Sequence, residues 1–453
     1  MREASPLPFW LDRPRPAEAP PLDGDAEADL AIVGGGFTGL WAAVLAKRER
    51  PDREIVLLEA DTAGWGASGR NGGFVDSSLT HGLANGASRF PRELDALEEL
   101  GRANLAEMKA DLAALGVDAA WEENGLLSVA TQPHELADLD EEVALLRRYG
   151  HDAAVLDREA IRAEVASPTY LGGVLQRTGV GLVDPGALAL GLRAAANTLG
   201  VRIHERTPVV SATEAQLTTP GGVVRAPRVL LATGAYKPLT RSIRRLVAPV
   251  YDYVLVTEPL SAEQRRAVGW AHRQGIADRG NQFHYYRLTP DGRVLFGGYD
   301  AIYHFANRVS PRLERRAASF ALLHDHLLQT FPALEGIGIT HAWGGPIDTC
   351  SRFCVAFGRA LGGSAVYAVG YTGLGVGATR FGARTALDLL DGADTERTRL
   401  KLVRKRPLPF PPEPLRWAVI QATRIALARA DKRGGRRGPW LRLLDRLGLG
   451  FDT

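Results

Sequence analysis

The chain has 453 residues, of which 45% are hydrophobic, so it can bury a full core as two domains or as one large domain with an insertion. Its two cysteines exclude a disulfide framework and, without further ligands, a zinc site, which is typical of a protein of the reducing cytoplasm. From position 401 onward thirteen lysines and arginines accompany four acids, so the net charge of +3 hides a body of net charge −6, and a nucleic-acid role for that body has no support.

The first 27 residues are predicted to form an extended N-terminal arm. Residues 1–23 contain six prolines and should have little structure of their own. Phe9 and Trp10 are expected to anchor the arm by simple packing. The uncharged stretch 30–46 contains four glycines and follows three acids, so it favours neither a membrane span nor a signal core. We expect no transmembrane helix and no signal peptide.

A glycine-rich turn follows the first apolar run, residues 30–33, which is predicted to be a buried strand. Gly34, Gly36 and Gly39 fill the three glycine positions of G-x-G-x-x-G, which permit the tight turn, the approach of a pyrophosphate and close packing of the next helix. A second strand, residues 55–58, ends at Glu59, whose carboxylate can accept both ribose hydroxyls and would repel a 2′-phosphate. The pattern predicts binding of FAD or NAD through Gly34, Gly36, Phe37, Thr38, Gly39, Glu59 and Ala60.

The next loop, G-W-G-A-S-G-R-N-G-G at residues 64–73, is too rich in glycine to build a core. It can bring backbone N–H groups and polar side chains against a phosphate or a flavin ring. A flexible linker is the alternative, but the compact Arg-Asn pair disfavours it. The expected cofactor contacts are Gly66, Ala67, Ser68, Arg70, Asn71, Gly72 and Gly73.

These motifs resemble the opening of the FAD-dependent amine and amino-acid oxidases, the group with D-amino acid oxidase, glycine oxidase and sarcosine oxidase, and most of all its gamma-glutamylputrescine oxidoreductase-like members. The resemblance runs from about residue 28 to about residue 400. It implies a mixed α/β fold, in which a Rossmann-like FAD-binding domain (28–90, 155–247 and 340–400) is interleaved with an antiparallel β-rich substrate domain (91–154 and 248–339). A basic helical tail (401–453) is expected to follow.

Apolar spacing between these motifs predicts helices at 91–115 (one helix or a pair), 136–149 and 186–199, the last capped by Asp184. Strands are predicted at 122–130, 201–204 and 207–210. In similar proteins the strand corresponding to 207–210 holds the adenine, which makes Val209 an expected contact. The strand at 228–231 ends in Ala232, Thr233 and Gly234, which we also place at the cofactor.

The segment 367–379 begins as a strand and becomes a glycine-studded helix start, which suits N–H groups aimed at the anionic edge of a reduced flavin. It resembles the closing motif of the family. A tight helix–strand junction is the alternative. The expected contacts are Gly370, Tyr371, Thr372, Gly373, Leu374 and Gly375, and since no attachment residue is evident, the FAD is expected to be non-covalent.

Two stretches, 250–257 and 282–298, are predicted to be long antiparallel strands that roof the flavin, with a Pro-Asp-Gly turn in the second. Alternation places His284, Tyr286 and Leu288 on one face and Phe283, Tyr285 and Arg287 on the other. One face should look into the substrate pocket, and the parity stays open. We expect Tyr286 or Arg287 to face the substrate, with His284 or Arg287 as a source of positive charge; aromatic packing across strands is the alternative.

His324 and His326 lie in a predicted helix at 317–331, where two residues apart they point in different directions, so a surface role is favoured over a metal site. Cys350 and Cys354 are interpreted as small core residues. We predict no metal site.

The tail is predicted to contain a helix at 415–430 with an apolar stripe made of Leu415, Ala418, Val419, Ala422, Ile425 and Ala426. We expect this stripe to pack on the body while the arginines remain in water. The alternative is a membrane-surface helix that feeds electrons to a quinone.

The resemblance implies oxidation of a C–N bond: a neutral amine gives a hydride equivalent to the flavin, the imine hydrolyses, and oxygen or another acceptor takes the electrons. D-amino acid oxidases hold a substrate carboxylate with an arginine where this chain has W-G-G-P (343–346), which favours an amine, a polyamine derivative or an ω-amino compound. Sarcosine oxidases use a lysine to activate oxygen, and residues 238–400 contain none. The alternatives are a dehydrogenase that uses a quinone or carrier protein, and a docking protein with a structural flavin.

Overall fold

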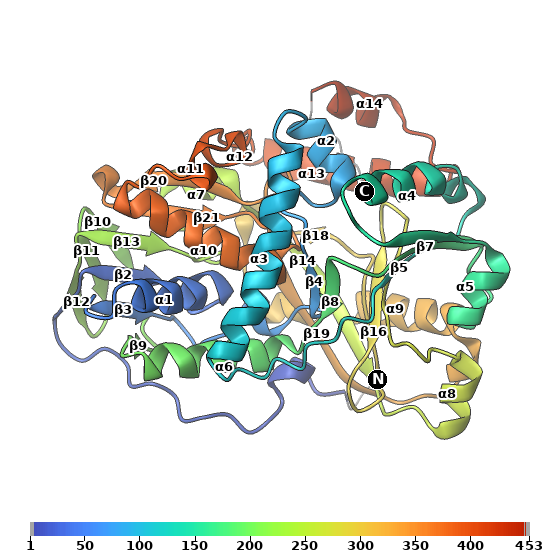
Figure 1. Ribbon diagram of the computed structural model, residues 1–453, viewed down its shortest axis with the longest axis horizontal. Coiled ribbons are helices and arrows are strands. Elements are labelled where there is room, and N and C mark those ends of the chain that lie inside the picture. Colours follow the sequence, from blue (N-terminus) through green and yellow to red (C-terminus); the bar gives the residue numbers. More distant parts are fainter. Residues whose placement is uncertain (1–3, 448, 450–453) are drawn as a thin grey trace.

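The computed structural model describes residues 4–447 and 449; the ends of the predicted arm and tail at 1–3, 448 and 450–453 lie outside the described residues. Two large sheets stand side by side, a six-stranded one at the left of Figure 1 and a nine-stranded one at the right. This arrangement confirms the predicted mixed α/β class.

The six-stranded sheet has the order β20-β21-β13-β2-β3-β9. Its strands are parallel except for the edge strand β20, and their bounds are β2 (Leu30–Val33), β3 (Ile55–Leu58), β9 (Arg202–His204), β13 (Arg228–Leu231), β20 (Ala356–Ala360) and β21 (Ala365–Val369). Leu30 and Ile32 pack into one hydrophobic cluster, and Ala31 and Val33 pack into another. Burial on both faces explains why these strands are continuous apolar runs.

One face of this sheet is covered by helices α1 (Phe37–Glu49), α6 (Pro185–Thr198) and α10 (Gly375–Asp391), with α3 (Leu94–Ala114) packed on α10. The other face packs against α7 (Arg241–Leu246) and a small sheet, β1 (Ala26–Glu27), β12 (Gly222–Arg225), β11 (Gln216–Thr219) and β10 (Ser211–Thr213). Asp184 caps α6 as predicted, since its carboxylate accepts the backbone N–H of Ala187.

The nine-stranded sheet has the order β18-β14-β17-β16-β15-β5-β7-β6, and β19 pairs with β14. Helices α5 (Arg158–Glu164), α8 (Ala262–Val268) and α9 (Ala317–Thr330) lie on its outer face. The strands are β5 (Leu126–Ala130), β6 (Ala153–Leu156), β7 (Gly172–Gln176), β14 (Ala248–Thr257), β15 (Gly275–Asp278), β16 (His284–Leu288), β17 (Val294–Gly298), β18 (Ile302–Tyr303) and β19 (Ile339–Thr349).

The remaining elements lie between or around the two sheets. A short ribbon of β4 (Phe74–Asp76) and β8 (Val180–Leu182) lies between them, and α2 (Leu83–Arg89) precedes α3. Helix α4 (Leu139–Arg148) packs on β6 and β7, and α11 (Glu396–Arg399) and α12 (Lys401–Arg404) follow α10.

Several predicted boundaries need correction. Strands β6 and β7 (153–176) and β19 belong to the nine-stranded sheet, whereas the ranges 155–247 and 340–400 had placed most of their residues in the FAD-binding domain. The physical reason for β19 is that it pairs with β14 along almost its whole length. Residues 207–210 form a loop and not a strand, and 91–115 contains one helix that starts at Leu94.

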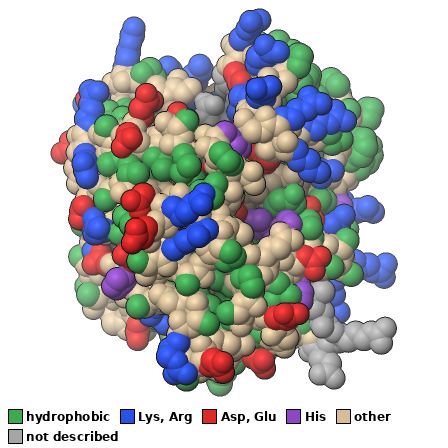
Figure 2. Space-filling model, turned by 90° about the vertical axis from the view of Figure 1, so that its right-hand side faces the viewer, with side chains coloured by type: hydrophobic (Ala, Val, Ile, Leu, Met, Phe, Trp, Pro, Cys, Tyr) green, Lys and Arg blue, Asp and Glu red, His purple; other side chains and the backbone are tan. Residues whose placement is uncertain are grey.

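Beyond α12, the described part of the tail forms two further helices, α13 (Leu415–Asp431) and α14 (Pro439–Arg446). Leu415, Ala418, Ala422 and Ile425 are exposed, so the prediction that the stripe packs on the body is wrong for these four residues. Val419 of the stripe turns inward with Ile420 and Leu427, and Ala426 is half-buried. Figure 2 shows hydrophobic and basic side chains next to each other at the upper right, where these helices lie. Across the described residues, no helix is both long and apolar enough to cross a bilayer.

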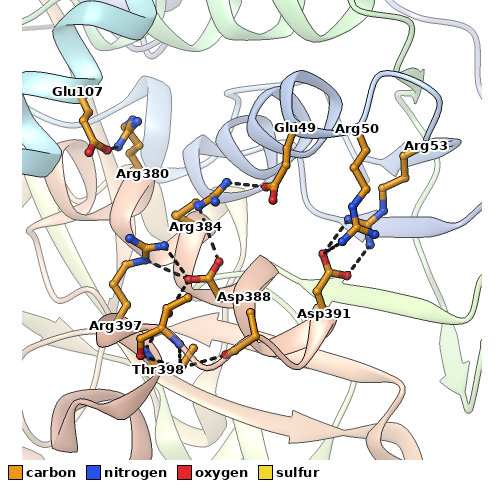
Figure 3. Close-up of polar contacts among 12 residues, drawn as sticks. Glu49, Arg50, Arg53, Glu107, Arg380, Arg384, Asp388, Asp391, Arg397 and Thr398 are labelled. Carbon is orange, nitrogen blue, oxygen red and sulfur yellow. Dashed lines mark hydrogen bonds and ion pairs between the residues drawn. The ribbon is translucent and has the colours of Figure 1, made fainter.

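Ion pairs tie α10 to its neighbours (Figure 3). Arg380 pairs with Glu107 of α3 at 2.6 Å and Arg384 pairs with Glu49 of α1 at 2.6 Å. Asp388, whose side chain is almost buried, accepts hydrogen bonds from Thr395 at 2.8 Å and from Arg397 at 2.7 Å. These contacts fix the helix whose first residues reach the site described below.

Replacing Asp388 with alanine is expected to lower the free energy of unfolding by about 3 kcal/mol, because Arg397 and Thr395 lose a buried acceptor. Urea unfolding followed by circular dichroism measures this change. The matched control is Asp394→Ala, which removes an exposed bidentate pair with Arg399 and should cost about 0–1 kcal/mol. Equal losses in the two variants would contradict the assignment.

Candidate functional site

A cavity of about 950 Å³ lies between the two large sheets. Val33 and Leu58 reach it from the carboxyl ends of β2 and β3, and Ala232 reaches it directly after β13. In doubly wound sheets this edge is where ligands bind. On the opposite side, β14, β16 and β19 contribute residues of the nine-stranded sheet. The cavity therefore joins a dinucleotide-type sheet edge to a broad β-sheet wall.

Two glycines of the fingerprint are required by close backbone contacts. Gly34 has a φ of +112°, and a Cβ there would lie 2.5 Å from the carbonyl oxygen of Ala232. A Cβ at Gly39 would lie 1.9 Å from the carbonyl oxygen of Gly34. Any side chain at either position would force strand, turn and helix apart.

Polar groups converge where α1 begins. The Ser68 hydroxyl accepts the N–H of Phe37 at 2.8 Å, in the first turn of α1. The Glu59 carboxylate accepts the N–H of Gly35 at 2.6 Å and that of Asp61 at 2.8 Å. Burial raises the pKa of Glu59, and these two N–H groups oppose that rise. The N-terminus of a helix, with an acid beside it, can receive a pyrophosphate and an adjacent ribose.

The loop at 64–73 is held by its own side chains. Arg70 donates to the carbonyls of Trp65 at 2.7 Å and Gly344 at 3.2 Å, and it pairs with Glu314 at 2.7 Å. Asn71 donates to the carbonyl of Ser68 at 2.8 Å and accepts the N–H of Gly73 at 2.8 Å. Both residues line the cavity, but these bonds engage their polar groups with protein partners.

The closing motif meets the fingerprint at the cavity floor. Tyr371 accepts a hydrogen bond from the Thr38 hydroxyl at 2.9 Å. Asp348, at the end of β19, accepts the N–H of Gly370 at 2.7 Å. Burial raises the pKa of Asp348 to about 6, although backbone N–H groups of this motif oppose the rise. These contacts connect both sheets through one hydrogen-bonded junction.

The structure brings together nearly all of the residues predicted from the motifs to touch a cofactor. Gly39, Gly73 and Gly370 do not line the cavity, since they serve close packing or turns. The residues that do line it are Gly34, Gly36, Phe37, Thr38, Glu59, Ala60, Gly66, Ala67, Ser68, Arg70, Asn71, Gly72, Val209, Ala232, Thr233, Gly234, Tyr371, Thr372, Gly373, Leu374 and Gly375.

Unsatisfied polar atoms support occupancy by a polar ligand. Within the part of the chain that the structure describes, Thr233 Oγ1, Tyr236 OH and Thr379 Oγ1 are buried without a hydrogen-bond partner, and all three residues line the cavity. Buried polar groups without partners are costly, so a ligand with donors and acceptors would satisfy them. The residues present therefore fit an adenine dinucleotide.

The face of β16 that lines the cavity carries Phe283, immediately before the strand, and Tyr285. Tyr285 donates to Asp252 of β14 at 2.5 Å. Asp252 also accepts the N–H of Tyr253 at 2.8 Å. Burial raises the pKa of Asp252 to about 6, and the Tyr285 hydrogen bond opposes the rise. An acid held by a tyrosine hydroxyl thus lies on the sheet wall of the cavity.

The three residues predicted to be catalytic do not line this cavity, and that prediction is corrected. Tyr286 faces α9, where its hydroxyl bonds Tyr170 at 2.8 Å and its ring stacks on Phe296. Arg287 shares the face of Tyr285 but is buried over Trp10 and donates to Val183 at 2.6 Å. The alternation of side chains along β16 could not show which of its two faces looks into the cavity. Helix α9 covers the face that carries Tyr286.

The prediction for His326 of α9 also needs correction. His326 packs on the sheet, where its Nδ1 lies 2.8 Å from Nε2 of His284, and His284 Nδ1 lies 2.6 Å from Asp278. The predicted surface role fits neither its partial burial nor this contact. His284 therefore belongs to a polar chain behind the sheet wall.

Sequence patterns missed one wall of the cavity. The C-terminal segment contributes Leu408, Pro409 and Phe410 before α13, and Val419, Ile420, Thr423, Arg424 and Leu427 within it. Asp431 fastens α13 by accepting the N–H groups of Asn281 and Gln282 at 3.1 Å. The sequence pattern that could have predicted this wall is the second apolar face of α13, at Val419, Ile420 and Leu427.

Comparisons with known proteins agree with this geometry. The family described as FAD dependent oxidoreductase matches residues 29–389. Gamma-glutamylputrescine oxidoreductase of Escherichia coli (strain K12) is 33% identical over 398 residues, which cover 83% of this chain and 86% of the relative. The structure of glycine oxidase from Geobacillus kaustophilus is similar with a TM-score of 0.69 and 22% identity, and the match covers 82% of this chain and 96% of that one. L-proline dehydrogenase from P. horikoshii has a TM-score of 0.66 at 17% identity over 84% of this chain and 96% of its own. These findings confirm the resemblance expected from the motifs.

Replacing Gly34 with alanine is expected to abolish FAD binding, because the new Cβ collides with the Ala232 carbonyl and displaces the turn. The visible absorbance of the purified variant, per protein chain, measures bound flavin. Gly24→Ala is the matched control, since Gly24 also has a positive φ of +90° but nothing lies within 4 Å of its Cβ position. Full flavin content in the Gly34 variant would refute the role of the turn.

Proposed function

The chain belongs to the family of FAD-dependent oxidoreductases, and on that premise we propose that it oxidises a C–N bond of a primary or secondary amine to an imine, with oxygen as the acceptor of the electrons. The substrate class comprises amines, polyamine derivatives and ω-amino compounds. The single observation that carries this proposal is the pair of Asp252 and Tyr285 on the sheet wall of the cofactor cavity.

FAD fits the cavity through the fingerprint, Glu59, the loop at 64–73 and the closing motif. When bound, FAD supplies the hydride acceptor for the amine carbon and the store of electrons for the final acceptor. The chain contributes polar groups at the N-terminus of α1 and unpartnered hydroxyls at Thr233 and Tyr236. It also contributes an apolar wall from the tail, which keeps water away from the reacting carbon.

Asp252 is assigned the role of binding the protonated amine and accepting its proton, which leaves the neutral amine that gives up a hydride. Among the described residues it forms no ion pair with an arginine or lysine, so its charge is available to a cationic substrate. Asp300, which also lines the cavity, is already paired with Arg316 at 2.9 Å. Tyr285 orients the Asp252 carboxylate, and Phe283 and Phe353 add aromatic surface to the lining of the same cavity.

A clamp for an α-carboxylate is not evident at the W-G-G-P segment. Trp343 donates its Nε1 hydrogen to the carbonyl of Arg70 at 3.0 Å, and Gly344 presents a carbonyl to the Arg70 guanidinium. That guanidinium is neutralised by Glu314. The local charge therefore favours an amine over an α-amino acid.

Two alternative functions would use the same FAD cavity. In the first, a dehydrogenase passes the electrons to a quinone or carrier protein; the fold is shared with a glycine oxidase and with an L-proline dehydrogenase, so the fold does not choose between acceptors. In the second, the FAD is structural and the protein docks a partner. The presence of Asp252 beside the cavity favours catalysis over this second alternative.

The test of the proposed function is an anaerobic titration of the purified holoenzyme with polyamines, N-methyl amines, aminophosphonates and amino acids. Bleaching of the flavin absorbance by one amine class, with prompt recovery and peroxide formation when air enters, is expected. Bleaching with slow recovery would select the dehydrogenase. Absence of bleaching with every amine would contradict the proposal.

Tyr285→Phe and Tyr286→Phe form a matched pair of neighbouring tyrosines that face opposite ways. Tyr285→Phe is expected to lower kcat/KM by about tenfold, because Asp252 loses its orienting hydroxyl. Tyr286→Phe should change kcat/KM less than about twofold, since its hydroxyl bonds Tyr170 behind the wall. Steady-state kinetics with the amine identified above would measure both, and the reverse order would refute the assigned face.

The pH dependence of kcat/KM should report Asp252. Because the pKa of Asp252 is raised to about 6, the carboxylate gains a proton as pH falls through that value, and kcat/KM for a cationic amine should fall with it. Removing the Tyr285 hydrogen bond raises this pKa further, so Tyr285→Phe should move the acid limb to higher pH. Asp252→Asn should abolish the limb; an unchanged limb would contradict the assignment.

A further inference from the structure

Exposed large hydrophobic side chains concentrate in the C-terminal segment. Of eleven such residues that the structure describes, six lie between positions 408 and 447: Leu408, Leu415, Trp417, Ile425, Leu443 and Leu447. Leu447 is 62% exposed and Leu415 is 56% exposed. Scattered single residues need no explanation, but a cluster of this kind marks a binding surface.

Helix α13 has two apolar faces. Val419, Ile420 and Leu427 line the cavity, so that face already has its place in the fold. Leu415, Ala418, Ala422 and Ile425 recur at intervals of three and four residues and are exposed. This second stripe is covered by no other part of the described chain.

Helix α14 packs on α13 and carries exposed apolar and basic side chains of its own. The Trp440 Nε1 hydrogen bonds the Thr423 hydroxyl of α13 at 3.0 Å, which holds the two helices together. Leu443 and Leu447 lie one turn apart and are exposed, and Arg442 and Arg446 are exposed one residue before each of them. Leucines and arginines therefore alternate along one side of α14.

The charge of this region is positive and largely uncompensated. Arg429, Lys432, Arg433 and Arg436 are exposed, in addition to the arginines of α14. The acids of the described tail have other partners: Glu413 accepts from the Tyr303 hydroxyl, Asp431 holds residues 281–282, and Asp445 pairs with Arg437. The exposed side chains of α13 and α14, hereafter the C-terminal surface, thus combine leucine, isoleucine and tryptophan with free basic groups.

We propose that the C-terminal surface docks the protein on an anionic lipid bilayer. Apolar side chains of a surface helix enter the headgroup boundary while arginines and lysines meet lipid phosphates. A protein partner fits less well, because it would have to place acids opposite many exposed basic residues and also cover the leucines. These basic residues are Arg429, Lys432, Arg433, Arg436, Arg442 and Arg446. The bilayer gives both kinds of side chain their preferred surroundings.

This docking would set the cavity against the membrane. Leu408 lines the cavity and is 59% exposed, so it stands at the mouth, and Leu444 of α14 lines the same cavity. The helices that carry the C-terminal surface also close the cavity. A docked enzyme would therefore open toward the lipid and not toward bulk water.

The test is sedimentation of the full-length holoenzyme with vesicles. Vesicles of phosphatidylcholine with phosphatidylglycerol are expected to bind the protein at low salt and to release it at high salt, while pure phosphatidylcholine vesicles bind it weakly. The double variant Arg442→Gln/Arg446→Gln should bind about thirtyfold more weakly, at about 1 kcal/mol for each lost basic residue. Leu443→Gln/Leu447→Gln should also weaken binding, at both salt concentrations.

The matched control removes one exposed apolar and one exposed basic residue elsewhere, as Val155→Gln/Arg266→Gln, and should bind like the parent. Flavin absorbance and the thermal midpoint verify that each variant is folded, since the substituted side chains are exposed. Failure to bind anionic vesicles, or equal binding by all variants, would overturn the proposal. A dimer in light scattering that Leu443→Gln/Leu447→Gln dissociates, without vesicle binding, would assign the surface to a second copy and overturn it too.

Discussion

The fold depends on one close backbone contact at the carboxyl end of β2. A Cβ at Gly34 would lie 2.5 Å from the carbonyl oxygen of Ala232. A Cβ at Gly39 would lie even closer, at 1.9 Å, to the carbonyl oxygen of Gly34. Only glycine allows β13, the turn after β2 and helix α1 to approach so closely. That approach aims the first turn of α1 into the cavity, where Ser68 and Glu59 already hold backbone N–H groups. The dinucleotide-binding site at the start of α1 is thus a consequence of backbone packing.

The second sheet gives the cavity its chemistry through simple alternation. Tyr285 and Tyr286 are neighbours on β16, yet one reaches Asp252 in the cavity and the other packs under α9 beside Phe296 and Tyr170. Side chains that are two residues apart share a face, so His284 goes with Tyr286 and contacts His326 of α9. One face packs against α9, and the other turns Tyr285 toward the cavity. A shift of one residue would exchange these roles.

The sequence predicted which residues of the first sheet and its loops line the cavity because these signals are local. The fingerprint, Glu59, the loop at 64–73 and residues 371–375 each show their pattern within a few positions, and all reach the same cavity. The substrate half depends on contacts between distant segments. Which face of β16 is covered depends on α9, some thirty residues later along the chain, and the sheet that holds β19 depends on its pairing with β14. The tail helix has two apolar faces, and which one turns inward depends on contacts with distant segments. Asp431 accepts hydrogen bonds from residues 281–282, and Arg416 donates to Asn307.

The geometry of the cavity implies one non-covalent FAD per chain, and identifying what the purified protein releases on denaturation tests this. Denaturing the protein with acid, removing the precipitate and resolving the supernatant by chromatography and mass spectrometry gives the identity and amount of the cofactor. Close to one FAD per chain is expected in the supernatant, because the proposed contacts in the cavity are hydrogen bonds and packing. Flavin that stays with the precipitate, a nicotinamide dinucleotide in its place, or no adenine-containing cofactor would rule out a non-covalent FAD in this cavity.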